Sequence, residues 1–154
     1  MSDASTAPVR RRGRGLVRRL LLAAAVFAAV IQVIPARRTN PPVRSDLHAP
    51  GEVKEILRRA CYDCHSHETR WPWYSRVAPV SWWVVSHVNE ARGDLNFSEW
   101  PRFDHELAGM ALRDIDKQVT EEKMPLPSYT IMHAGARLRE VERQTLIGWA
   151  RSGP

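Results

Sequence analysis

The sequence lacks the patterns on which several large protein classes depend. No run alternates apolar and polar residues as a half-buried strand does, so a sheet protein is excluded. No internal repeat, glycine-rich phosphate loop or plausible Ser/His/Asp set occurs, which argues against repeat proteins, nucleotide-binding enzymes and serine hydrolases. Cysteine is also scarce, because Cys61 and Cys64 are the only two in 154 residues.

Acidic residues are almost absent from the N-terminal quarter. The net charge is +6, but residues 1–38 hold eight arginines and one acid, and the remaining 15 Lys/Arg and 16 Asp/Glu nearly cancel. The excess of positive charge therefore belongs to the N-terminal segment, and residues 39–154 are nearly neutral. This distribution argues against a basic nucleic-acid-binding face, so we expect no nucleic-acid partner.

The two cysteines belong to the pentapeptide 61–65, which reads C-x-x-C-H, the attachment signature of c-type haem. On a helix, positions i, i+3 and i+4 share one face. Cys61 and Cys64 can then each form a thioether with one porphyrin, while His65 lies under the iron as its proximal ligand. We therefore expect one covalently attached haem c.

Other roles of a C-x-x-C pair are a redox dithiol or half of a zinc site. A dithiol of this kind usually lies in a βαβ frame, which nothing here indicates. Zinc would need two further ligands, and the remaining histidines lack the H-x-x-x-H spacing that could supply them.

An uncharged segment, residues 20–36, follows six arginines. A cleaved signal peptide has this pattern, but no A-x-A-like cleavage site follows. We therefore predict an uncleaved transmembrane anchor at residues 16–36, behind a basic cytoplasmic N-terminus, residues 1–15. A 17-residue helix is about 25 Å long, so flanking arginines would have to reach the headgroups. The arginine bias predicts a single-pass protein of the bacterial inner membrane with its C-terminal domain in the periplasm.

Residues 37–49 are predicted to form an extended linker, and residues 50–154 the domain. Within the domain, residues 51–60 carry an apolar stripe at helical spacing that leads directly into the cysteines. Prolines frame the linker at positions 35, 41, 42 and 50, which favours an extended tether.

Four of the six tryptophans fall within residues 66–83. Such a cluster can form a small core, and it can also form the wall of a haem site. As wall residues we predict Trp71 and Tyr74, with Arg70 as a donor to the propionates. The carbonyl of Pro79 is predicted to accept the second ring N–H of His65.

Several motifs together resemble the bacterial haem-binding domain family of membrane-anchored, monohaem c-type proteins. The resemblance covers about residue 50 to the C-terminus and implies a cytochrome c-like domain around one haem. His67 departs from the family pattern, and we expect it to be exposed to solvent. The motifs are C-x-x-C-H-S at 61–66, T-x-W-P-W-Y-S at 69–75, A-P-V-S-W at 78–82, H-V at 87–88 and L-N-F-S-E-W at 95–100.

Three further helices are predicted from apolar periodicity. They cover residues 79–92, 104–120 and 138–151, with Gly93 as the C-cap of the first. His87 lies on the apolar stripe of residues 79–92, where a satisfied core histidine is the commoner role and a haem ligand the alternative.

Met124 precedes a proline in a predicted loop without helical periodicity. It matches the Met-Pro loop that supplies the distal ligand in many c-type cytochromes, and a thioether suits low-spin haem iron. We predict Met124 as the distal ligand, with His87, His133 and Met132 as alternatives.

The sequence therefore predicts an all-α, cytochrome c-like domain behind one transmembrane helix. We expect it to be an electron carrier and not an enzyme, with His65 and Met124 as axial ligands and an unidentified redox protein as partner. The alternatives are a haem-based gas sensor and a peroxidase-like accessory subunit with an open distal site.

Overall fold

The computed structural model describes residues 11–101 and 104–153. Residues 1–10 of the predicted basic N-terminus lie outside this range. The described chain is all-helical, with one isolated parallel bridge between Ser45 and Glu99 and no strand. The all-α prediction is confirmed.

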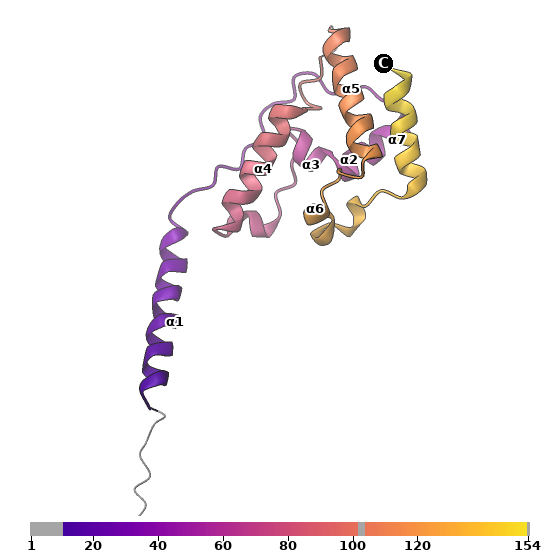
Figure 1. The fold of residues 1–154 in the computed structure, drawn as a ribbon. Helices are drawn as coiled ribbons and strands as arrows, with labels where there is room; N and C mark the ends of the chain where they lie inside the picture. The colour runs from indigo at the N-terminus through magenta and orange to yellow at the C-terminus, as the bar shows by residue number, and fades with distance from the viewer. Residues whose placement is uncertain (1–10, 102–103, 154) are drawn as a thin grey trace, which may run out of the picture.

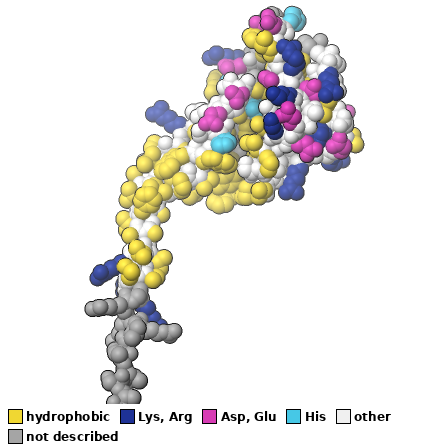
Figure 2. All heavy atoms as spheres, in the orientation of Figure 1, with side chains coloured by type: hydrophobic (Ala, Val, Ile, Leu, Met, Phe, Trp, Pro, Cys, Tyr) yellow, Lys and Arg dark blue, Asp and Glu magenta, His cyan; other side chains and the backbone are white. Residues whose placement is uncertain are grey.

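The chain begins with a long helix that extends away from the domain, α1, residues Arg11–Ile31 (Figure 1). In the part of the chain that the structure describes, α1 contacts no other helix. Its apolar side chains are exposed, among them Leu21 and Phe27, each at 66%. Figure 2 shows this apolar surface along the helix.

The structure contradicts the predicted membrane anchor. Among residues 11–101 and 104–153, no helix combines the length and the apolar character that a membrane crossing needs. The physical reason is the position of the helix end. Because α1 ends at Ile31, its uncharged part covers residues 20–31, about 18 Å of helix against a bilayer core of about 30 Å. The predicted single-pass placement in the inner membrane, with a periplasmic domain, is withdrawn.

Residues 32–47, which we call the strap, lie against the domain. Gln32 pairs with both backbone groups of Ala78, at 2.9 and 3.2 Å. Farther along, the Arg38 guanidinium donates to the Ser75 carbonyl at 2.8 Å, and Leu47 N donates to Phe97 O at 2.9 Å. The predicted extended linker is therefore hydrogen-bonded to the domain along its length.

Helices α2, α5 and α7 build the core of the domain. They cover Gly51–Ala60, His105–Thr120 and Glu140–Ser152, and α7 packs against both of the others. The apolar stripe predicted for residues 51–60 is buried in α2. Asp104 caps α5 by accepting from Leu107 N at 2.9 Å, which explains why this helix begins where it does.

The remaining elements form the other half of the domain. They are α3 (Tyr62–His65), η1 (Trp73–Arg76), α4 (Val80–Asp94), α6 (Pro127–Met132) and η2 (Ala134–Ala136). Helix α4 packs on α3 and η1, and α6 lies beside η2 (Figure 1). The prediction that Gly93 is the C-cap of this helix is wrong, because α4 continues to Asp94 and its C-cap is Leu95.

Candidate haem site

The pentapeptide 61–65 forms a turn of its own between two helices. Cys61 ends α2 and begins α3, so the attachment motif starts at a break in the helix and not inside it. One helical turn still joins the ends of the motif, because His65 N donates to Cys61 O at 2.9 Å. Both cysteines are free thiols, as thioether formation requires.

His65 is oriented by two backbone carbonyls. Its Nδ1 lies 3.0 Å from Ala91 O and 3.1 Å from Leu95 O, at the end of α4. The predicted partner, Pro79, is therefore wrong, because Pro79 lies at the opposite end of α4, as the residue before its first turn. Shielding from water lowers the pKa of His65, which favours the neutral ring. A neutral ring that donates from Nδ1 keeps Nε2 available as a ligand for a metal.

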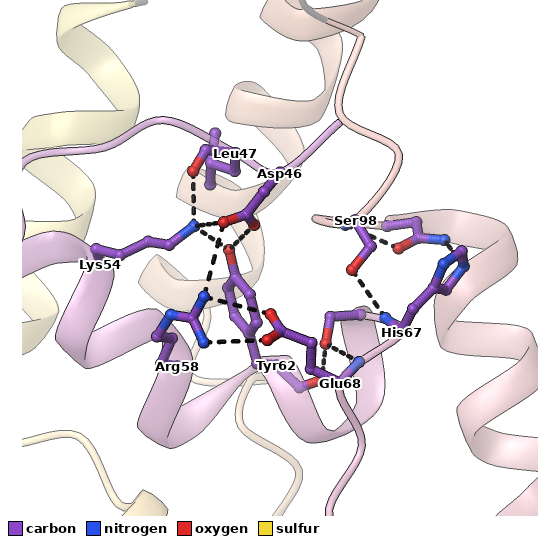
Figure 3. A network of polar contacts seen from close by, with 10 residues as sticks. Asp46, Leu47, Lys54, Arg58, Tyr62, His67, Glu68 and Ser98 are labelled. Carbon is purple, nitrogen blue, oxygen red and sulfur yellow. Dashed lines mark hydrogen bonds and ion pairs between the residues drawn. The ribbon is translucent and has the colours of Figure 1, made fainter. Parts of the chain in front are cut away.

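Tyr62, which lies between the two cysteines, is held by a polar network on the side of Asp46 (Figure 3). The Tyr62 hydroxyl donates to Asp46 Oδ1 at 2.8 Å, and Lys54 Nζ binds Asp46 Oδ2 at 2.7 Å. The Tyr62 ring is stacked on Phe97, with centroids 5.0 Å apart. These contacts fix the backbone of the attachment turn to the strap and to the core.

His67 is 7% exposed, so the prediction that it faces solvent is wrong. Its Nδ1 lies 3.0 Å from Pro42 O, and its Nε2 lies 2.9 Å from Asn96 Nδ2. Both ring nitrogens are used, which makes His67 a bridge between the strap and the loop after α4. Figure 3 shows His67 beside Ser98 of that loop, whose hydroxyl accepts from His67 N at 2.9 Å.

A cavity of about 280 Å³ lies beside the attachment turn. Its walls are mainly aromatic and aliphatic, with few polar groups, as is usual for sites that bind flat apolar cofactors. The turn contributes Asp63 and Cys64, and α4 and α6 face each other across the cavity. The lining residues are Asp63, Cys64, Thr69, Arg70, Pro72, Trp73, Tyr74, Val80, Trp83, Val84, His87, Val88, Leu126, Ser128, Tyr129, Met132 and His133.

The apolar stripe predicted for residues 79–92 is the wall that α4 presents to the cavity. Val80, Trp83, Val84, His87 and Val88 all line it. Helical spacing places these five side chains on one face of α4. His87 is thus a cavity residue and not a core histidine, with Nδ1 3.1 Å from Trp83 O.

Among the predicted wall residues, Tyr74 and Arg70 line the cavity and Trp71 does not. Trp71 Nε1 donates to Asn40 Oδ1 at 3.1 Å, so this indole holds the strap. The Arg70 guanidinium pairs with Asp63, with Nε 3.2 Å from Oδ1. Trp73 and Trp83 form the aromatic wall in place of Trp71, and they are exposed at 72% and 51%.

On the α6 side, the structure brings Met132 and His133 to the cavity and leaves Met124 outside its lining. Met124 is half-buried in the loop after α5, where its N–H donates to Gln118 O at 3.2 Å. His133 Nδ1 lies 3.2 Å from Tyr129 O, and Nε2 lies 3.5 Å from the Tyr74 hydroxyl. His133 therefore resembles His65 in having Nδ1 next to a backbone carbonyl, but of the two only His133 lines the cavity.

The residue pair Asp63–Tyr129 was missed by the sequence reasoning. The Tyr129 hydroxyl donates to Asp63 Oδ2 at 2.8 Å across the cavity wall. Pro127 could have indicated the helix that carries Tyr129, because proline is common at the first position of a helix and Pro127 begins α6. Apolar periodicity predicts no helix over residues 127–132, so Tyr129 had no predicted place beside Asp63.

The chain matches the family described as haem-binding domain over residues 26–152. Searches of curated proteins and of solved structures return no match. An apolar cavity with Cys64 on its wall fits this cofactor, and the free thiol of Cys61 and the oriented imidazole of His65 lie in the adjoining turn, outside the lining. The chain belongs to the haem-binding domain family.

Proposed function

We propose that the protein is a one-electron carrier with one c-type haem attached through Cys61 and Cys64. The observation that carries the proposal is the attachment turn, in which both thiols and an oriented imidazole lie within five residues, beside an apolar cavity. The bound haem would supply a one-electron couple at its iron. The protein residues would fix the porphyrin, orient His65 as the proximal ligand and keep water away from the apolar walls.

The distal ligand is proposed to come from residues 124–133. This segment holds Met124, which the sequence predicts, and also Met132 and His133, which line the cavity. A second protein ligand would close the other axial position of the iron, which favours electron transfer over reactions with small molecules. The proposed partner is another redox protein.

The absorption spectrum of the purified protein tests this proposal. We expect haem that stays with the chain on a denaturing gel, a low-spin spectrum in both oxidation states and no rapid binding of carbon monoxide. Single Met124→Ala, Met132→Ala and His133→Ala variants identify the ligand, because only the loss of the true ligand gives a high-spin ferrous form. If all three variants keep the wild-type spectrum, the distal ligand lies outside residues 124–133 and His87→Ala is the next variant.

A haem-based sensor is the second candidate, and one observation favours it. Since Met124 does not line the cavity, an iron bound there could keep an open distal position. Prompt carbon monoxide binding by the wild-type ferrous protein would support the sensor and overturn the electron carrier.

A further inference from the structure

Asp63 is a buried carboxylate in the middle of the attachment turn. It lies between the two cysteines and is 9% exposed. The Arg70 backbone N–H and Nε both donate to Oδ1, at 3.0 and 3.2 Å. The Arg70 Nη2 and the Tyr129 hydroxyl donate to Oδ2, at 3.3 and 2.8 Å. A carboxylate with this many donors is held firmly in one position.

Tyr129 belongs to α6 and connects Asp63 to His133, the residue that follows this helix. Its ring is stacked on His133, with centroids 4.2 Å apart and planes 19° apart. Its carbonyl oxygen lies 3.0 Å from His133 N and 3.2 Å from His133 Nδ1. Burial and the neighbouring Asp63 raise the pKa of the Tyr129 hydroxyl, so that it remains a donor at neutral pH.

Among residues 11–101 and 104–153, no other hydrogen bond joins residues 61–65 to α6. Residues 127–132 have no buried side chain among the described residues, so core packing does little to fix this short helix. His133, the residue after α6, has a long contact with the Tyr74 hydroxyl, at 3.5 Å. The Asp63–Tyr129 hydrogen bond is therefore a direct connection between residues 61–65 and α6 that core packing does not duplicate.

We propose that Asp63 is a positioning residue, which ties the attachment turn to α6 through Tyr129 and so fixes Met132 and His133 at the cavity. This inference rests on haem occupying that cavity. It also assigns Asp63 an electrostatic effect, because its carboxylate is a negative charge on the cavity wall that offsets the guanidinium of Arg70. A negative charge near the iron stabilises the oxidised form and lowers the reduction potential.

Tyr129→Phe and Asp63→Asn test the connection, and Tyr62→Phe is the matched control. Tyr62→Phe removes the same kind of hydroxyl–carboxylate bond from the neighbouring residue of the same turn, but on the side of Asp46. In the full-length haem-loaded protein, we expect the amides of Thr130, His133 and Ala136 to exchange hydrogen about tenfold faster or more in both test variants. That is the change expected from losing one hydrogen bond to a charged group. Tyr62→Phe is expected to leave these three amides unchanged.

The reduction potential and the electron paramagnetic resonance spectrum separate positioning from a merely structural role. We expect Asp63→Asn to raise the potential, since it leaves the charge of Arg70 without its partner, and both test variants to broaden or shift the low-spin signal. Tyr62→Phe should lower thermal stability without either change. Wild-type exchange in α6 for Tyr129→Phe, or equal spectral shifts in Tyr62→Phe, would overturn the proposal.

The outcome is independent of whether the protein carries electrons. A haem protein with another role would still show the potential and the resonance signal. If the chain held no haem, hydrogen exchange of α6 in the full chain would still decide whether Asp63 and Tyr129 connect the turn to the helix.

Discussion

At the scale of single residues, the environment of Cys61 and Cys64 disfavours the negatively charged thiolate, which is the reactive form of a cysteine. Burial raises the pKa of Cys61 to about 12 and that of Cys64 to about 11, from an ordinary value of 9.0. A neighbouring acidic group raises each pKa further. For Cys61 this group is the Cys64 thiol, and for Cys64 it is the Asp63 carboxylate. Because the thiolate is the nucleophile, both cysteines should react slowly once the chain has folded.

We expect the haem-free folded chain to react with an alkylating reagent at pH 7.5 at least about tenfold more slowly than the chain in guanidinium. The raised pKa values leave few thiolates, and the rate should climb as pH rises above 9. Stopped-flow measurement of alkylation gives the rates. A Ser86→Cys variant on exposed α4 surface is the control, and it should react quickly in native buffer. Equal rates for the native thiols and for this control would show that the turn is open.

At the scale of elements, helical periodicity predicted α2, α4, α5 and α7, because each buries or presents one continuous apolar stripe. It could not predict α6, which has six residues, no buried side chain and therefore no stripe to detect. The sequence also predicts that residues 61–65 directly follow the helix of residues 51–60, and the structure has them there, in a turn whose backbone hydrogen bonds are local. The contacts of Asp63 with Tyr129 and of Trp71 with Asn40 were not, because they join residues 66 and 31 positions apart.

The contact of α7 with α2 depends on Glu142, which is 9% exposed. The Arg139 backbone N–H donates to Oε2 at 2.8 Å, and Arg59 Nη2 from α2 binds Oε1 at 2.7 Å. The backbone and guanidinium of Arg139, together with Arg59, hold the pKa of Glu142 at about 2. This carboxylate therefore caps α7 and ties it to α2 at the same time.

We expect Glu142→Gln to lower the free energy of unfolding at pH 7 by about 2 kcal/mol, as for a lost hydrogen bond to a charged group. Because folding depresses the pKa of Glu142, its contribution is complete above the unfolded value of about 4.5 and is lost as pH falls toward 2. Urea unfolding from pH 7 to pH 2.5 measures both effects. Glu140→Gln, in the same first turn but exposed, is the control and should cost less than about 0.5 kcal/mol. A Glu142→Gln variant that kept the wild-type loss of stability below pH 4.5 would contradict this assignment.

At the scale of the whole molecule, the strap joins α1 to the domain, and Asn40 is its central contact. The Asn40 Nδ2 donates to Thr69 O at 2.9 Å, and its Oδ1 accepts from Trp71 Nε1 and Arg92 Nη2, at 3.1 and 3.2 Å. The guanidinium of Arg92 also lies over the Trp71 ring, 6.0 Å from its centroid. One asparagine thus connects the strap with three separate positions of the domain.

We expect trypsin to cleave the wild-type chain in α1, after Arg18 or Arg19, before it cleaves the strap after Arg37 or Arg38. A helix without tertiary contacts opens more readily than a segment hydrogen-bonded to a core. Asn40→Ala should speed cleavage in the strap about tenfold, since three hydrogen bonds are lost, and should leave the rate in α1 unchanged. Mass spectrometry of timed digests gives both rates. Asn89→Ala, an exposed asparagine of α4, is the control, and wild-type strap cleavage in Asn40→Ala would show that Asn40 does not hold the strap.

The pairing of Gln32 with Ala78 has a mechanical consequence. These two hydrogen bonds are the first that a force applied along α1 would load, because they join the residue after the helix to Ala78, two residues before α4 begins. The next, from Trp82 Nε1 to Ile34 O at 3.2 Å, also loads the first turn of α4, and the one from Arg38 to Ser75 loads the residue beside Tyr74. A pulling force on α1 would thus be transferred to η1 and to the start of α4. Both elements contribute to the wall of the cavity, η1 through Tyr74 and α4 through Val80. We therefore expect a force on α1 to reach the wall of the cavity through the strap, although α1 contacts no other described helix.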